Sequence, residues 1–197
     1  LALQRELLPS GHPEIATTLS NTGAMHRRAG NYAAAVPLLE EALAMREKVF
    51  PVDHPAVLTS QNMLAVSYQD QGRTKDALAL ARKVLAARRA KLGEHPQVAG
   101  SYYTIGSLLT VLEDHEAAEE HLRRSIAIYS ATLPTDHLDR VRPMAFLGES
   151  FLKQSRVEDA IPLLEESLRV RRKLLSGDHP EVTQLEDALR RAAALGR

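Results

Sequence analysis

Apolar side chains recur along this chain at the three- and four-residue spacing of an α-helix, in a block that returns several times. In the block from 54 to 85 the stripe consists of Val57, Met63, Leu64 and Tyr68, and side chains so spaced share one helical face. Similar stripes predict four pairs of helices, at about 13–29 and 32–49, 55–71 and 74–92, 96–112 and 115–131, and 138–154 and 157–175. A single further helix is expected after residue 179. The predicted fold class is therefore all-α, built from antiparallel helix pairs.

A His-Pro dipeptide opens each block. The copies are His12-Pro13, His54-Pro55, His95-Pro96 and His179-Pro180, with His137-Leu138 as a variant, and the histidines are 42, 41, 42 and 42 residues apart. A constant period of this length is typical of stacked repeats. Proline suits the first helical position, where its missing N–H has no partner in any case, and the residue before it can cap the helix. Stacked helices lie about 10 Å apart, too far for one histidine from each block to share an ion at about 2 Å. Capping is therefore expected, not metal binding.

Small residues recur at two further places in the block. The predicted turn between the helices falls at Gly30, Gly72, Glu113 and Ser155. Within the first helices a small residue returns at Gly23, Ala65, Gly106 and Gly148. Glycine inside a helix is about 1 kcal/mol less favourable than alanine. Its recurrence therefore indicates that a neighbouring helix approaches closely at this point.

Prolines interrupt the pattern in three helices. Pro37 and Pro162 fall early in second helices, where a slight bend is expected. Pro143 falls several residues after His137, where the other copies are already helical. We expect that first helix to start late, near Arg142, or to kink there.

The repeats divide the chain into a single array. The predicted boundaries are 1–11 for the end of a preceding, truncated repeat, 12–53, 54–94, 95–136 and 137–178 for four repeats, and 179–197 for a C-terminal capping helix. The last helix has a narrow apolar stripe, and Arg190 stands where the other first helices have glycine or alanine. A polar outer face is what a terminal helix of a stacked array needs.

The composition excludes some classes of function but does not identify one. Lys+Arg and Asp+Glu are equal at 25 each, so no overall charge favours nucleic acid or an acidic membrane. Cysteine is absent, which excludes disulfides and thiolate chemistry and is consistent with a cytoplasmic protein. No apolar run reaches the roughly 18 residues of a membrane span. Nucleic-acid and membrane partners are therefore not expected.

The repeated residues resemble the tetratricopeptide pattern of a large residue, x-x-Leu-Gly/Ala-x-x-Tyr, followed by Ala-x-x-x-Phe. The second copy reads Gln61-x-x-Leu64-Ala65-x-x-Tyr68, then Ala77-x-x-x-Ala81. The other copies begin at Leu19, Tyr102 and Met144. The longer period, the His-Pro opening and the phrase EALAMREKVF are similar to the kinesin light chain type of this repeat.

This resemblance implies a right-handed α-solenoid whose first helices line a concave groove for a peptide or a partner helix. Asn21 and Asn62 match the asparagines that hold a ligand's backbone in the family, a task that suits an amide because it both donates and accepts hydrogen bonds. The groove residues carried over from the family pattern are Ser20, Asn21, Arg27, Asn62, Val66, Gln69, Tyr103, Ser107, Arg142 and Glu149.

Catalytic motifs are absent from the sequence: it has no glycine-rich phosphate loop, no HExxH, no zinc spacing and no nucleophile motif. We therefore expect no enzyme activity, no cofactor and no bound metal. The leading hypothesis is a module that binds a protein or peptide ligand in its groove. The alternative is a structural role, in which the array self-associates or serves as a regulatory arm of a larger protein, as such repeats do in bacterial signalling proteins.

Overall fold

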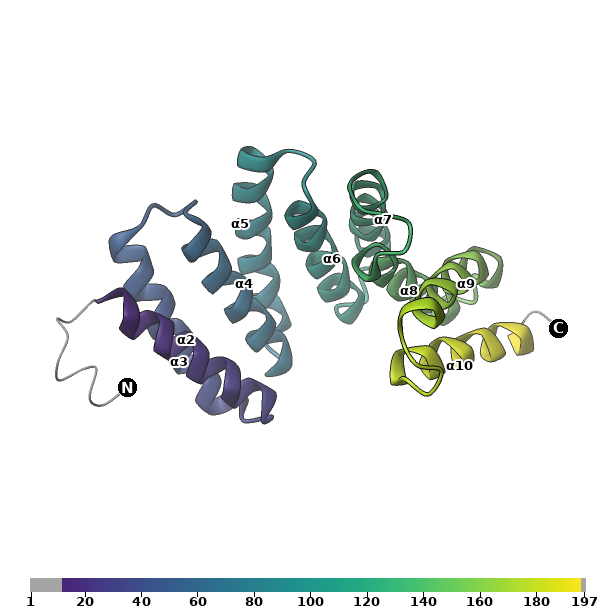
Figure 1. Cartoon of the computed structure of the whole chain (residues 1–197), viewed down its shortest axis with the longest axis horizontal. Helices are drawn as coiled ribbons and strands as arrows, with labels where there is room; N and C mark the ends of the chain where they lie inside the picture. The colour runs from purple at the N-terminus through teal and green to yellow at the C-terminus, as the bar shows by residue number, and fades with distance from the viewer. Residues whose placement is uncertain (1–11, 196–197) are drawn as a thin grey trace. The chain divides into compact units, whose positions relative to one another are not determined.

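A computed structural model describes residues 12–195 of the chain, and all regular structure among them is helical (Figure 1). The all-α prediction is confirmed. The predicted fragment of a preceding repeat, 1–11, lies outside the described residues. The chain divides into two compact units, Leu1–Lys91 and Leu92–Arg197, which are described separately below. The helices are α2 (Pro13–Arg28), α3 (Tyr32–Val49), α4 (Pro55–Asp70), α5 (Thr74–Leu92), α6 (Pro96–Val111), α7 (His115–Thr132), α8 (Leu138–Lys153), α9 (Val157–Leu174) and α10 (Pro180–Leu195).

Histidine caps the start of every first helix. In each copy the ring Nδ1 accepts a hydrogen bond from the backbone N–H two residues later, at 3.1 to 3.3 Å. The cap satisfies one of the N–H groups that a helix leaves without an internal partner. The capping prediction is therefore confirmed, and it holds at His137 even though leucine replaces proline there.

The turn between the helices of a pair has one backbone conformation in all four copies. Gly30, Gly72, Glu113 and Ser155 have φ angles of 74°, 81°, 62° and 59°. Glycine adopts this left-handed region freely, whereas a residue with a Cβ is strained in it. The turn thus needs the same geometry everywhere, and the second unit forms it with Glu113 and Ser155 at some conformational cost.

Close contact between paired helices explains the recurring glycines. A Cβ on Gly23 would lie 2.8 Å from Cγ of Leu39. The equivalent distances are 2.7 Å for Gly106 and Leu122 and 2.8 Å for Gly148 and Leu164. Atoms at such distances overlap, so a leucine of the second helix fills the space that glycine leaves on the first.

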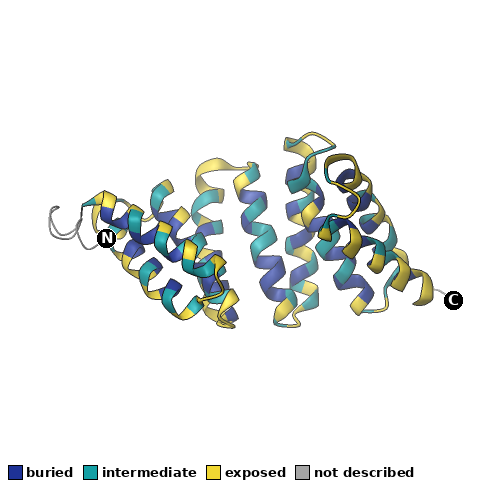
Figure 2. Ribbon diagram, turned by 60° about the horizontal axis from the view of Figure 1, so that its bottom comes forward, coloured by how far each residue is buried: buried dark blue, intermediate teal, exposed yellow. Residues whose placement is uncertain are grey.

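Each unit has its own hydrophobic core along the faces where its helices meet (Figure 2). In the first unit, Leu39 and Leu43 of α3 cluster with Leu64 of α4, and Leu80 of α5 packs against them. In the second unit, a larger cluster extends from Leu122 of α7 through α8 and α9 into α10. Helix α10 is part of this core through Val182, Leu185, Ala188 and Ala192.

The prediction of a late start for α8 is wrong. The helix begins at Leu138 and continues through Pro143. Pro143 cannot donate the hydrogen bond that the carbonyl of Asp139 would otherwise accept. The His137 cap on the N–H of Asp139 at 3.1 Å starts the helix at its usual place, and the buried side chains of Val141 and Pro143 hold this turn against the core.

Candidate functional site

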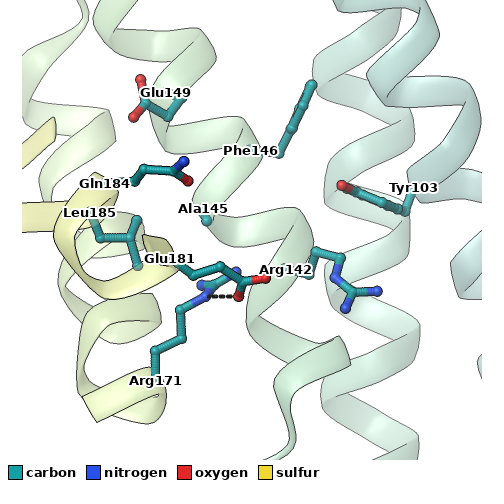
Figure 3. A pocket seen from close by; sticks show the side chains of 9 residues that line it. All are labelled: Tyr103, Arg142, Ala145, Phe146, Glu149, Arg171, Glu181, Gln184 and Leu185. Carbon is teal, nitrogen blue, oxygen red and sulfur yellow. Dashed lines mark hydrogen bonds and ion pairs between the residues drawn. The ribbon is translucent and has the colours of Figure 1, made fainter. Parts of the chain in front are cut away.

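A pocket of about 250 Å³ lies among the first helices of the second unit (Figure 3). Helices α6, α8 and α10 supply most of its walls, and α9 contributes one side chain. The pocket brings together three of the predicted groove residues, Tyr103, Arg142 and Glu149. The complete lining is Tyr103, Arg142, Ala145, Phe146, Glu149, Arg171, Glu181, Gln184 and Leu185.

One side of the pocket is aromatic. The rings of Tyr103 and Phe146 meet edge to face, with their centroids 6.0 Å apart and an interplanar angle of 88°, the arrangement that aromatic pairs favour. Burial raises the pKa of Tyr103, so its hydroxyl remains protonated at neutral pH. The pocket therefore offers two ring surfaces and one hydroxyl that can both donate and accept a hydrogen bond.

The opposite side is polar and is built around Arg171. This side chain is only 6% exposed, and its Nε donates a hydrogen bond to Oε2 of Glu181 at 2.9 Å. That bond holds the pKa of Glu181 below its usual range. Within residues 12–195, Nη1 of Arg171 has no hydrogen-bond partner. A buried donor left in this state costs about 1–3 kcal/mol, and because this atom is shielded from solvent, a ligand would reach it only if neighbouring side chains moved.

Arg142 and Glu149 are each held by a salt bridge. Nη1 of Arg142 lies 3.3 Å from Oδ1 of Asp139. Both carboxylate oxygens of Glu149 accept hydrogen bonds from Nη2 of Arg191, at 2.9 and 3.0 Å. The Arg191 contact joins α8 to α10, which fixes the position of Glu149 beside the pocket.

The predicted groove residues of the first unit lie on α2 and α4. Arg27 of α2 is bound to Asp70 of α4 at 2.9 Å, so its charge is already neutralised. Asn21 is exposed, so its side-chain amide is accessible to a ligand. The three predicted residues on α4 are half-buried: Asn62, Val66 and Gln69.

Ser20 and Ser107, two of the predicted groove residues, have hydroxyls that are already engaged. Ser20 is 5% exposed; it accepts a hydrogen bond from Nη1 of Arg46 at 2.7 Å and donates one to the carbonyl of Ala16. Ser107 is 7% exposed and donates to the carbonyl of Thr104 at 2.9 Å. These two side chains belong to the scaffold, since neither hydroxyl is presented to a ligand.

Ala145 also lies at a groove position of the family pattern, and the other five lining residues were missed; three of these lie on α10 and one on a second helix. The missed residues are Phe146, Arg171, Glu181, Gln184 and Leu185. A signal existed for Arg171: one repeat period separates Arg46, Arg88, Tyr129 and Arg171. Arg46 shows what this position does, since its guanidinium extends from α3 to Ser20 of α2 and Ser60 of α4.

The pocket presents hydrogen-bonding groups of several kinds. Its polar groups are two guanidiniums, two carboxylates in salt bridges, an amide and a phenol. In the part of the chain that the structure describes, no three His, Asp or Glu side chains are placed to hold a metal ion. Across the same residues no helix is both long and apolar enough to cross a membrane.

The sequence matches a family model of the tetratricopeptide repeat in four overlapping segments, at residues 1–48, 14–90, 56–131 and 97–173. Together these segments cover residues 1–173 of the 197-residue chain. A search of curated proteins gives no match.

Solved structures similar to this chain include kinesin light chain-like repeats. Two crystal structures of putative kinesin light chain TPR-like repeats from Podosopora anserina are 27% and 25% identical to it, with TM-scores of 0.79 and 0.73. Each alignment covers 94% of this chain, and 88% and 96% of those chains. BtubC (BKLC) from P. vanneervenii has the same fold at 18% identity, with a TM-score of 0.75 over 93% of this chain and 77% of that one.

Proposed function

The chain belongs to the tetratricopeptide repeat family, whose repeats generally mediate protein–protein interactions, and we propose that it binds a peptide or a helix of a partner protein on its first helices. The observation that carries this proposal is the pocket among α6, α8 and α10. It combines an aromatic corner with the guanidinium of Arg142 and the amide of Gln184.

The aromatic corner supports the binding of one large apolar side chain. Tyr103 and Phe146 hold each other edge to face, so little side-chain entropy is lost when a ligand docks against them. Ala145 and Leu185 extend the apolar surface. Buried aromatic contacts with a polar surround are typical of residues that dominate binding energy.

The polar side supports the binding of a peptide backbone. Arg142 and Gln184 both line the pocket and carry N–H donors. A peptide carbonyl or carboxylate would accept hydrogen bonds from these groups. In the first unit the proposed contacts are Asn21, Asn62, Val66 and Gln69, where the amides can pair with a peptide unit whatever its side chain. The proposed role is non-catalytic.

Partner capture from a lysate of the source cells, followed by a peptide array of the captured protein, tests the proposal. Asn62→Ala and Tyr103→Ala should each weaken binding by about tenfold, as expected for loss of a contact worth about 1.4 kcal/mol. Tyr103→Phe separates the contribution of the hydroxyl from that of the ring, and Gln71→Ala, an exposed change at the end of α4, is the matched control.

Unchanged binding in both Asn62→Ala and Tyr103→Ala would contradict the groove proposal. Light scattering at two protein concentrations then decides the alternative. A mass that rises with concentration would favour the self-associating array, and a strict monomer would exclude it.

A further inference from the structure

Helix α5 has a cationic surface that distinguishes it from the other helices. Its sequence, TKDALALARKVLAARRAKL, has one acidic residue, Asp76, and the cations Lys75, Arg82, Lys83, Arg88, Arg89 and Lys91. The whole chain has equal numbers of acidic and basic residues. The excess on α5 is therefore local, and the remainder of the chain offsets it.

Three of these cations form one row along the helix. Lys75, Arg82 and Arg89 are seven residues apart, or about two turns, so they lie above one another at intervals of roughly 10 Å. Ala79 and Ala86 lie between them on the same face. All five side chains are exposed. We call Lys75, Arg82 and Arg89 the α5 row.

The α5 row is not neutralised within residues 12–195, where none of its three cations has an ion-pair or hydrogen-bond partner. Nearby carboxylates are engaged elsewhere. Asp76 is bound by Arg73 at 2.8 Å, and Asp53 lies 3.7 Å from Lys91. The row is therefore a cationic surface without a counter-charge.

Second helices of the other unit show the contrast. On α7, Arg123 pairs with Glu119 at 2.8 Å. On α9, Arg169 pairs with Glu166 at 2.8 Å and Arg172 with Glu186 at 2.7 Å. Exposed arginines on these helices have carboxylate partners from their own unit, and the α5 row has none among the described residues.

We propose that the α5 row binds an acidic α-helix of a partner protein. Glutamates at every seventh position of such a helix repeat at the same roughly 10 Å interval as the row. Ala79 and Ala86 form a low surface between the cations, which lets a second helix backbone approach closely. The row has no aromatic side chain on which nucleobases could stack, so a helix fits it better than a single-stranded nucleic acid.

This surface is separate from the groove. The α5 row lies on a second helix, whereas the proposed groove contacts of the same unit lie on α2 and α4. A partner could therefore bind the row whether or not a peptide occupies the groove.

The probe is a fluorescently labelled helical peptide with glutamate at every seventh position of one face, titrated with the full 197-residue chain. The triple variant Lys75→Gln, Arg82→Gln, Arg89→Gln should bind it about tenfold more weakly, because three exposed ion pairs are lost. Binding of the unaltered chain should weaken as salt rises from about 0.05 to 0.3 M, because exposed charges are screened.

The matched control is the triple variant Arg28→Gln, Lys48→Gln, Lys153→Gln, which removes the same charge from exposed positions outside α5. It should bind like the unaltered chain, and a peptide with the same glutamates spread around the helix should bind more weakly than the probe. Circular dichroism confirms that both variants remain folded.

Equal weakening in the two triple variants would overturn the proposal, because it would show an effect of net charge alone. Tighter binding of poly(A) RNA or duplex DNA, lost with the α5 row, would also overturn it and identify a nucleic-acid surface. Asn62→Ala should leave probe binding unchanged, which separates this result from failure of the groove proposal.

Discussion

The helix pairs α4/α5 and α8/α9 share the same structural positions but differ in the side chains that occupy them. In both, an aromatic side chain near the end of the first helix stacks with an arginine at the start of the second. Arg73 lies 3.9 Å from the ring centroid of Tyr68, and Arg156 lies 4.0 Å from that of Phe151. In α3 and α7 the matching arginine is replaced by Asn31 or Asp114, whose side chain caps the helix. A stacked arginine and a side-chain cap are thus two ways to organise the same turn.

The two pairs differ in how deeply the aromatic residue is buried. Phe151 is 1% exposed, and Arg123 also lies near its ring, at 5.7 Å. Tyr68 is half-buried, and its hydroxyl donates a hydrogen bond to Glu40 at 2.7 Å. The α8/α9 pair therefore relies on apolar burial at this point, and the α4/α5 pair combines a ring with a surface hydrogen bond.

They also differ where the helices approach most closely. The α8/α9 pair places Gly148 against Leu164, and the α4/α5 pair has alanine at both matching positions, Ala65 and Ala81. A larger residue on the first helix thus goes with a smaller one on the second, and the two alanines fill less space than glycine with leucine.

The largest expected effect comes from removing the buried ring. Phe151→Ala should destabilise the second unit by about 3–5 kcal/mol, because it leaves a cavity in the core and removes the surface on which Arg156 stacks. Tyr68→Ala should destabilise the first unit by clearly less, because half of that residue is already in water. Urea unfolding monitored by circular dichroism measures both, and equal losses would contradict the difference in burial.

The contact between Gly148 and Leu164 is tested by a double-mutant cycle. Gly148→Ala should cost about 1–3 kcal/mol through overlap with Leu164, and Leu164→Ala about 2–5 kcal/mol through the cavity it leaves. The double variant reproduces the alanines of α4/α5, so it should be little worse than Leu164→Ala alone, with a coupling of about 1 kcal/mol or more. Strict additivity would show that the two positions do not share space. Ala65→Gly with Ala81→Leu is the converse control.

Substitutions at the turn residues should have smaller effects on stability, of opposite sign in the two helix pairs. Ser155→Gly should stabilise the chain by about 0.5–1 kcal/mol, because it relieves the left-handed conformation at φ 59°. Gly72→Ala should destabilise it by about 1 kcal/mol, because it imposes a Cβ at φ 81°. Thermal melting measures both changes, and stabilisation by Gly72→Ala would contradict the shared turn geometry.

The smallest expected effect is on how the folding stability declines at acid pH. Hydrogen bonds from Arg169 lower the pKa of Glu166 in the folded chain. The stability from this pair is present above the ordinary glutamate pKa and is lost as pH falls through the lowered folded value. Glu166→Gln should therefore reduce the free energy of unfolding at pH 7 by less than about 1 kcal/mol, which lowers the melting temperature slightly. It should also flatten the decline of the melting temperature between pH 5 and 3. Glu165→Gln, an exposed change on the same helix, should leave the decline as it was.

How far the sequence predicts the site depends on which helix supplies a residue. Tyr103 and Arg142 lie on first helices at positions that the family pattern marks, and both line the pocket. Arg171 could not be placed by that pattern, because it comes from a second helix and its reach depends on how α9 packs against α8 and α10. Ser20 was predicted as a contact, but the guanidinium of Arg46 covers it, and that cover comes from a different helix.

The sequence by itself determined the all-α fold, the repeat period, the histidine caps and the close approach at each glycine. These are properties of residues near one another along the chain or one period apart, so a single sequence displays them. Only the tertiary structure decided that α8 runs through Pro143, that Glu113 and Ser155 adopt left-handed angles, and which charges are paired. Those outcomes depend on side chains from other helices, whose contacts offset a local cost or neutralise a local charge only when the chain has folded.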